Sequence, residues 1–314
     1  MAILIDAPLW PAHGMLWSHL VSDSSYAELH EFARASGLAR RSFDLDHYDV
    51  PETRYASLIA AGAIAVDPRE LVHRLRGSGL RVKSRDREAL RPARRLAYLT
   101  EEWRALPTLL TAAGSAPQIE GWVSLGDELI DRWAEPHRAY HTLTHLEDVL
   151  LALDQLSIRG EAIAVETLLA AWFHDAVYTG HGNRDERDSA GLAVARLDSA
   201  GLDPRLSKLV GELVIETIPG GAGAAGNEGA RHLLDADLAI FAAPESRYTE
   251  YREAVRREYA HVPDDQFRQG RSRILDAYLE RERIYATAPA HELWEGRARA
   301  NLAAEVKAFK ANQL

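Results

Sequence analysis

From Trp122 to the C-terminus, apolar residues recur with the spacing of helix faces, and alternating β patterns almost vanish. A period of 3.6 residues sustained over this length favours packed helices. Pro136, Gly160, Gly201 and Pro219 mark breaks between them. An all-α helical bundle is therefore expected over residues 93–314. The predicted helices lie at about residues 96–112, 121–133, 144–157, 161–177, 187–199, 204–217, 231–241, 246–260, 265–283 and 291–310.

The first part of the chain alternates short strand-like and helical segments, which predicts a small α/β domain. The charged stretch at residues 81–95, which contains Pro92, follows it and is interpreted as a linker or a solvated helix face. We therefore predict two domains, at residues 1–92 and 93–314. The N-terminal elements are strands at about 3–5, 41–43 and 63–66 and helices at about 25–33, 52–61 and 68–75.

Composition argues against several classes of function. The 314 residues include no cysteine, so disulfides, thiolate nucleophiles and cysteine-ligated zinc are excluded. The formal charge of -10 argues against broad binding of nucleic-acid phosphates. No apolar run approaches the roughly 18 residues of a membrane span, and the first residues lack the pattern of a secretory signal. We expect a cytoplasmic protein with no nucleic-acid or membrane partner, and the sequence does not indicate its oligomeric state.

Histidines and aspartates of the helical part are spaced like the ligands of a metal ion. His141 and His145 are four residues apart, so they lie on one side of a helix. A strongly apolar segment ends in His174 and Asp175, where burial is costly unless the polar groups are bonded or liganded. Asp237 can complete a mixed nitrogen and oxygen shell. Each residue alone is more often a satisfied core or surface group, but the ordered set predicts a metal site.

Four motifs extend this pattern. They are residues 135–141 (EPHRAYH), 171–178 (AWFHDAVY), 233–238 (LLDADL) and 283–285 (RIY). On these motifs residues 98–314 resemble the HD-domain metal-dependent phosphohydrolases, which have an ordered H…HD…D ligand set on a helical core. The resemblance implies His145, His174, Asp175 and Asp237 as metal ligands, with Asp235 as the alternative to Asp237.

The same resemblance implies an enzyme that hydrolyses a phosphate ester with a metal-activated water. It implies one divalent ion, which is Mn, Mg, Fe, Co, Ni or Zn, and a small, nucleotide-like phosphomonoester or phosphodiester as the substrate. Asp175 would also orient the water. Residues 140–149 further resemble a motif of cyclic-nucleotide phosphodiesterases, which implies that His141 protonates the leaving oxygen.

Further residues are candidates for supporting roles. Arg271 and Arg283 are candidates to hold the substrate phosphate, with ion pairing on a helix surface as the alternative. Asp185, Glu186 and Asp235 are candidates to support the ligands, and the first two are alternatively charges at the start of a helix.

The glycine-rich segment at residues 217–227 contains no histidine, whereas HD relatives commonly carry additional histidine in this interval. We therefore expect a single metal ion. The segment lacks the Lys-Ser/Thr ending and the preceding strand of a phosphate-binding P-loop, so it is interpreted as mobile.

About the first 82 residues resemble a family of small bacterial domains of unknown function (DUF4031-like), on residues 17–23 (WSHLVSD), 28–33 (ELHEFA) and 46–51 (DHYDVP). This resemblance implies a recurrent module without an assigned activity. A set of polar residues in it is compatible with another metal site, but turns, helix caps and surface histidines are the favoured interpretation. The set comprises Asp6, His13, His19, Asp23, His30, Asp44, Asp46, His47 and Asp49.

Two other functions remain open at this point. The helical part is alternatively a metal-containing binding or regulatory module without turnover, because a fold does not guarantee catalysis. A di-iron oxygenase is the other alternative, and it requires more ligands than the sequence shows.

Overall fold

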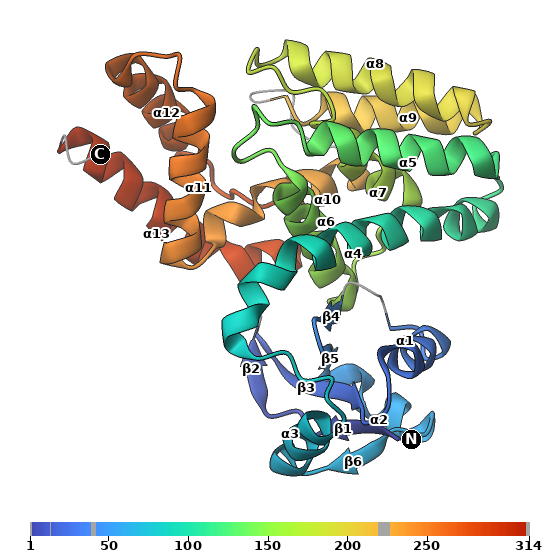
Figure 1. Cartoon of the computed structure of the whole chain (residues 1–314). Coiled ribbons are helices and arrows are strands. Elements are labelled where there is room, and N and C mark those ends of the chain that lie inside the picture. The colour runs from blue at the N-terminus through green and yellow to red at the C-terminus, as the bar shows by residue number, and fades with distance from the viewer. Residues whose placement is uncertain (1, 13, 39–41, 219–226, 312–314) are drawn as a thin grey trace. The chain divides into compact units, whose positions relative to one another are not determined.

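A computed structural model describes residues 2–12, 14–38, 42–218 and 227–311. Contacts among these residues divide the chain into two units, Met1–Glu102 and Trp103–Leu314. The first is a small α/β unit and the second is mostly helical, which confirms the predicted fold class (Figure 1). None of the described helices is long and apolar enough to cross a membrane.

The described part of the first unit contains one sheet, with strand order β4-β5-β3-β1-β6 and with β2 paired to β3. β1 and β6 are parallel, and the other pairs are antiparallel. β3 is therefore the central strand, which pairs with β1, β2 and β5. The strands are β1 Ile3–Asp6, β2 Trp10–Ala12, β3 Met15–Ser22, β4 Phe43–Asp44, β5 His47–Pro51 and β6 Ile64–Val66.

Helices cover both faces of this sheet. Successive strand residues point to opposite sides, so β1 and β3 place apolar side chains on both faces. On one face, Ile5 and Leu20 share a core cluster with Leu29 of α1 and Leu58 of α2. On the other face, Leu4 and Val21 pack with Leu71 and Leu75 of α3. The helices are α1 Tyr26–Ala35, α2 Glu52–Ala60 and α3 Pro68–Gly77.

The charged segment predicted as a linker or a helix face is helical from Ser84 onward. It forms the first part of α4, Ser84–Ala112, which starts in the first unit and ends in the second. The predicted domain break near residue 92 lies inside this helix, and the contacts instead divide the chain after Glu102. Its arginines explain the difference, because Arg87 pairs with Asp44 and Arg94 donates to the carbonyl of Phe43. These bonds attach the start of α4 to the first unit.

The second unit is a bundle of helices that follows the predicted pattern closely. The main difference is α7, which ends at Phe173 rather than near residue 177. His174 and Asp175 therefore lie just after the helix. The described helices are α5 Ile119–Trp133, α6 Leu143–Ile158, α7 Val165–Phe173, α8 Arg184–Ser199, α9 Pro204–Ile215, α10 Glu228–Asp237, the short 3-10 helix η2 Leu238–Ala242, α11 Glu245–Glu258, α12 Asp264–Leu279 and α13 Ala288–Lys310.

Buried tryptophans hold the centre of this bundle together. The rings of Trp103 and Trp122 stack with centroids 4.2 Å apart, and each indole donates to the other residue's carbonyl, at 2.7 and 3.0 Å. Trp133 donates its indole N–H to the carbonyl of Trp172 at 3.0 Å, and its ring centroid is 5.4 Å from that of His174. The core therefore fixes the end of α7, where the predicted ligands begin.

Close packing at Gly126 gives a test of this core. A Cβ at Gly126 would lie 2.2 Å from Cδ1 of Trp103, whereas a Cβ at Gly121 in the same helix would meet nothing within 4 Å. Gly126→Ala should lower the free energy of unfolding by about 1–3 kcal/mol because it overpacks the core. Gly121→Ala should leave it unchanged or raise it by up to about 1 kcal/mol. Urea denaturation of the two variants measures the difference, and equal stabilities would contradict the packing described.

Candidate metal centre

Three helices of the second unit bring the predicted ligands together. His145 lies in the first turn of α6, His174 and Asp175 follow α7, and Asp237 is the last residue of α10. These three helices pack against one another (Figure 1). The structure therefore places in one cluster four residues that span 92 positions of the sequence, from 145 to 237.

The four side chains face one another at short distances. The Nε2 atoms of His145 and His174 are 3.2 Å apart. Oδ1 of Asp237 is 3.1 Å from Nε2 of His145 and 3.7 Å from Nε2 of His174. Oδ2 of Asp175 is 3.3 Å from Nε2 of His174 and 3.8 Å from Nε2 of His145.

These separations fit a shared metal ion. Two ligand atoms that each lie about 2.1 Å from one ion are about 3.0 Å apart in adjacent octahedral positions, about 3.4 Å apart in a tetrahedron and at most about 4.2 Å apart in opposite positions. The separations of 3.1, 3.2, 3.3, 3.7 and 3.8 Å all lie within this range. Two imidazole nitrogens and two carboxylate oxygens are also a donor set that suits divalent transition metals. The residues present therefore fit the metal that the sequence predicts.

The histidines are held in the orientation that a ligand needs. His174 is 1% exposed, and its Nδ1 donates to the carbonyl of Ala171 at 2.8 Å, which leaves Nε2 as the acceptor. Burial alone would lower the pKa of His174, but the carboxylates of Asp175 and Asp237 raise it to about 9. Burial would likewise raise the pKa of Asp237, but hydrogen bonds with His145 and His174 lower it well below its usual range. These opposite shifts follow from the close approach of the imidazoles and the carboxylates to one another.

His141 lies beside the four ligands and has a different partner. Its Nδ1 is 2.7 Å from Oε2 of Glu258, and its Nε2 is 3.7 Å from Oδ2 of Asp175. Burial opposes protonation of His141, but the charges of Asp175 and Glu258 outweigh it and raise its pKa. His141, which precedes α6, and His145, which lies in its first turn, therefore have different partners: His141 pairs with Glu258, and His145 pairs with Asp237.

Glu258, at the end of α11, is a site residue that the sequence did not reveal. One of its carboxylate oxygens accepts from the backbone N–H groups of Ala139, Tyr140 and His141, at 2.8, 2.8 and 3.0 Å. Burial would raise the pKa of this carboxyl, but hydrogen bonding to His141 and the charge of His141 lower it to about 2. Glu258 therefore fixes both the backbone and the imidazole of His141.

Arg138 is a second such residue, and it lies within one of the quoted motifs. It is buried, and its guanidinium donates to the carbonyls of His141, Asp175 and Ala176, at 3.1, 2.7 and 3.1 Å. It thereby joins the His141 segment to the His-Asp segment. The motif at residues 135–141 contains Arg138, so the sequence carries a signal for this residue, whereas nothing around Glu258 distinguishes it from other helix-surface acids.

A cavity of about 430 Å³ opens at this cluster, and His141, Asp175 and Asp237 contribute to its wall. Arg271 of α12 is the one Arg or Lys that lines it among the described residues. Its Nε donates to Glu305 at 3.0 Å, and its buried Nη2 has no hydrogen-bond partner in the described part of the chain. A buried guanidinium N–H group without a partner is costly, and an anionic ligand in this cavity would satisfy it.

The other predicted residues take different places. Asp235 is buried and accepts from the backbone of Ala286 and Thr287, at 2.7 and 2.8 Å, rather than facing the cluster. Arg283 is exposed and does not line the cavity.

Asp185 and Glu186 both line the cavity at the start of α8. Asp185 accepts from the backbone N–H groups of Thr179 and His181, at 2.8 and 3.0 Å, so it shapes the loop that follows the His-Asp pair. Burial raises the pKa of Glu186, and its Oε2 is buried without a partner among the described residues. The segment predicted to be mobile, residues 217–227, lies largely outside the described residues, which omit 219–226.

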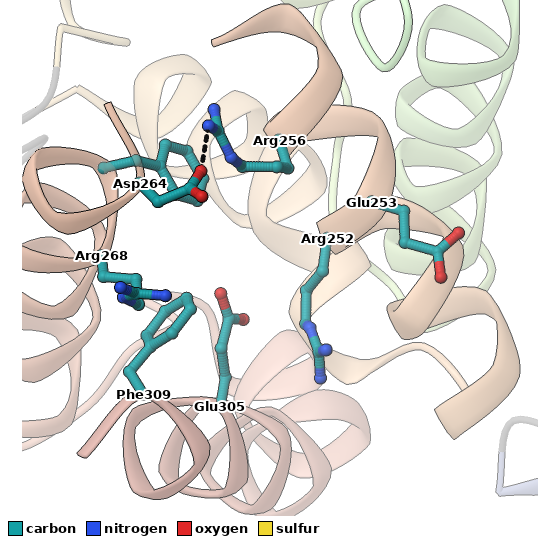
Figure 2. Close-up of a pocket in the computed structure, with 8 residues that line it drawn as sticks. Arg252, Glu253, Arg256, Asp264, Arg268, Glu305 and Phe309 are labelled. Atoms are coloured by element: carbon teal, nitrogen blue, oxygen red, sulfur yellow. Dashed lines mark hydrogen bonds and ion pairs between the residues drawn. The ribbon is translucent and has the colours of Figure 1, made fainter. Parts of the chain in front are cut away.

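A second, smaller cavity of about 220 Å³ lies between α11, α12 and α13. Figure 2 shows Arg256 and Asp264 paired beside it, with Arg252, Arg268 and Glu305 around the space. No histidine lines this cavity among the described residues. The smaller cavity therefore offers no imidazole to a metal ion, whereas Asp175 and Asp237 line the larger one.

Comparisons with known proteins support one of the two resemblances. Residues 3–78 match the family described as Protein of unknown function (DUF4031), which confirms the N-terminal resemblance. No family match supports the resemblance of residues 98–314 to HD-domain phosphohydrolases. Searches of curated proteins and of solved structures returned no match.

The geometry predicts which histidines bind metal. His145→Ala and His174→Ala should each weaken metal binding more than about 100-fold, because loss of even an outer partner of a ligand costs about 10- to 100-fold. His137→Ala is the control, since His137 is exposed and bonds to the carbonyl of Tyr178. Isothermal titration of the metal-free proteins with Mn²⁺ or Co²⁺ measures the affinities, and equal affinities in all three variants would contradict the site.

Proposed function

We propose that the second unit hydrolyses a phosphate ester with the help of one divalent metal ion. The observation that carries this proposal is the convergence of His145, His174, Asp175 and Asp237 at ligand distances, with Asp175 and Asp237 on the wall of a cavity. The unpartnered guanidinium N–H of Arg271 in the same cavity supports an anionic substrate. The resemblance of the motifs to HD-domain phosphohydrolases supports the reaction class.

His145, His174, Asp175 and Asp237 would hold the divalent ion, which would supply Lewis-acid polarisation of a phosphoryl oxygen and would lower the pKa of water from 15.7 toward about 7. His141 is placed to act as the general acid. Glu258 accepts a hydrogen bond from the Nδ1–H group of His141, so Nε2 is the nitrogen that is left to give a proton to the leaving oxygen. Three backbone N–H groups that also donate to Glu258 keep this pair in place.

The cavity wall favours a substrate with both an anionic and an apolar part. Arg271 is its one cationic side chain among the described residues, whereas Leu234, Phe241 and Tyr251 contribute apolar and aromatic surface. Aromatic and aliphatic walls of this kind suit a planar or hydrophobic group next to the phosphate. A nucleotide-like small molecule meets both requirements.

Replacement of the proposed acid should separate turnover from metal binding. His141→Asn should lower kcat about 10²- to 10⁴-fold, the contribution typical of general acid–base catalysis, while metal content stays at the wild-type level. Bis(p-nitrophenyl) phosphate and p-nitrophenyl phosphate, assayed with Mn²⁺, Mg²⁺, Co²⁺ or Ni²⁺, provide the readout.

A metal-loaded protein that hydrolyses neither these esters nor a panel of phosphorylated metabolites would favour a binding or regulatory module. Activity that survives His174→Ala would refute the site.

Two arginines offer a matched test of substrate binding. Arg271→Lys keeps the charge beside Glu305 but removes the unpartnered N–H group, so kcat/KM should fall by about 10- to 100-fold, as expected for one charge-assisted hydrogen bond. Arg283→Lys changes an exposed residue away from the cavity and should leave kcat/KM unchanged. If the two variants have the same kcat/KM, Arg271 does not bind the substrate.

A further inference from the structure

A second group of metal-ligating side chains lies in the first unit, on the sheet face that α3 covers. His19 of β3 and Asp49 of β5 are directly opposite each other in the antiparallel pair, and His47 is two residues before Asp49 on the same face. One ligand atom from each of the three residues lies within 4.8 Å of the other two. The sheet register therefore assembles these residues without any help from the second unit.

Each imidazole in this group is anchored through Nδ1 by a buried carboxylate. Nδ1 of His19 is 2.9 Å from Oδ2 of Asp6, and Nδ1 of His47 is 2.7 Å from Oδ1 of Asp46. A carboxylate accepts hydrogen bonds, so each Nδ1 carries a proton and Nε2 is the nitrogen left to bind a metal ion. Carboxylates bonded in this way to the far nitrogen are the usual partners of metal-ligating histidines.

The two anchoring carboxylates are themselves fixed. Asp6 is 1% exposed and also accepts from the backbone N–H of His19 at 2.5 Å and from the indole of Trp10 at 3.1 Å. Asp46 is fully buried and accepts from the backbone N–H of Val82 at 2.7 Å and from Arg81 and Arg87 at 3.1 Å each. Histidines that served only to pair with surface acids would not need two buried, fully bonded carboxylates behind them.

The free end of the His47 imidazole lies at a distance from the third ligand that suits a shared ion, and the His19 ring lies beside it. Nε2 of His47 is 3.2 Å from Oδ1 of Asp49, and the ring centroids of His19 and His47 are 4.9 Å apart with planes inclined by 73°. The value of 3.2 Å lies between the separations of about 3.0 and 3.4 Å expected for ligands of one octahedral or tetrahedral ion.

A cavity of about 700 Å³ adjoins the group, and His19, His47 and Asp6 line it from the sheet. From α3, Arg69 and Arg76 line the same cavity, and both are exposed. The cavity thus joins a carboxylate-anchored histidine pair to a positively charged wall, which suits a small anion beside a metal ion.

We propose that His19, His47 and Asp49 form a binding site for a divalent transition-metal ion in the first unit, separate from the ligands of the second unit. Three protein ligands leave coordination positions open toward the cavity. All three residues lie within residues 3–78, so the site would belong to the module that matches the family of unknown function. Of the other polar residues noted in this part of the sequence, His30 bonds to Tyr48 within the opposite core cluster, and His13 lies outside the described residues.

Metal content of the full-length protein tests this site. His19→Asn and His47→Asn keep an amide that can donate to Asp6 and Asp46 but remove Nε2. After equilibration with Co²⁺ or Zn²⁺ and removal of free metal, each variant should hold about one ion per chain less than the protein with both histidines. His73→Ala is the control, because His73 is an exposed residue of the same cavity wall and is not one of the three ligands.

The comparison is made in the wild-type protein and again in His174→Ala. Because the expected loss is a difference within each background, it does not depend on whether the second unit binds metal. Circular dichroism verifies the fold, and Asp49→Asn, which changes a half-exposed side chain, serves if a histidine variant does not fold. This variant should weaken Co²⁺ binding at least tenfold and alter the visible Co²⁺ spectrum. Metal content and Co²⁺ spectra identical to those of the parent in the folded variants would overturn the proposal.

Discussion

Arg138 and Glu258 bind the backbone on which the candidate metal centre of the second unit is built. Arg138 donates to carbonyls of the His141 and His174-Asp175 segments, and Glu258 accepts from three successive N–H groups before α6. These backbone groups lie outside regular helix bonding, and leaving them buried and unpaired would cost free energy. The Arg138 guanidinium donates to the carbonyl groups, and the Glu258 carboxylate accepts from the N–H groups. The predicted ligands therefore approach one another without leaving these backbone groups unpaired. The position of His141 depends on the same two residues.

The two units reach similar donor sets by different routes. In the second unit, helices deliver the ligands, and a backbone carbonyl orients His174. In the first unit, sheet register places His19 opposite Asp49, and buried carboxylates orient the imidazoles. A carboxylate partner makes an imidazole a more basic ligand than a carbonyl partner does. If both sites bind metal, the difference would give them different affinities.

The sequence predicted the bundle well because a sustained helical period specifies helices independently of their partners. It predicted the first unit less completely. The long strand β3 and the strand β5 were not among the predicted elements, since their pairing depends on residues distant in sequence.

The sequence also left Asp235 and Asp237 as alternatives for the last ligand. Two residues apart on a helix they point about 200° away from each other, so packing alone selects Asp237 for the cluster and turns Asp235 toward Ala286 and Thr287. Glu258 could not be predicted, because its partners lie 80 to 119 positions earlier and no local pattern marks it.

The most direct test of the account is anomalous diffraction from crystals of the full-length protein grown with Mn²⁺ or Co²⁺. In the second unit the account predicts a single peak within about 2.5 Å of Nε2 of His145, Nε2 of His174 and the carboxylate oxygens of Asp175 and Asp237. A pair of peaks there would contradict the single-ion centre. Its absence, or a peak at the separate group of Glu161, Glu228 and His232 instead, would contradict the assignment of the ligands.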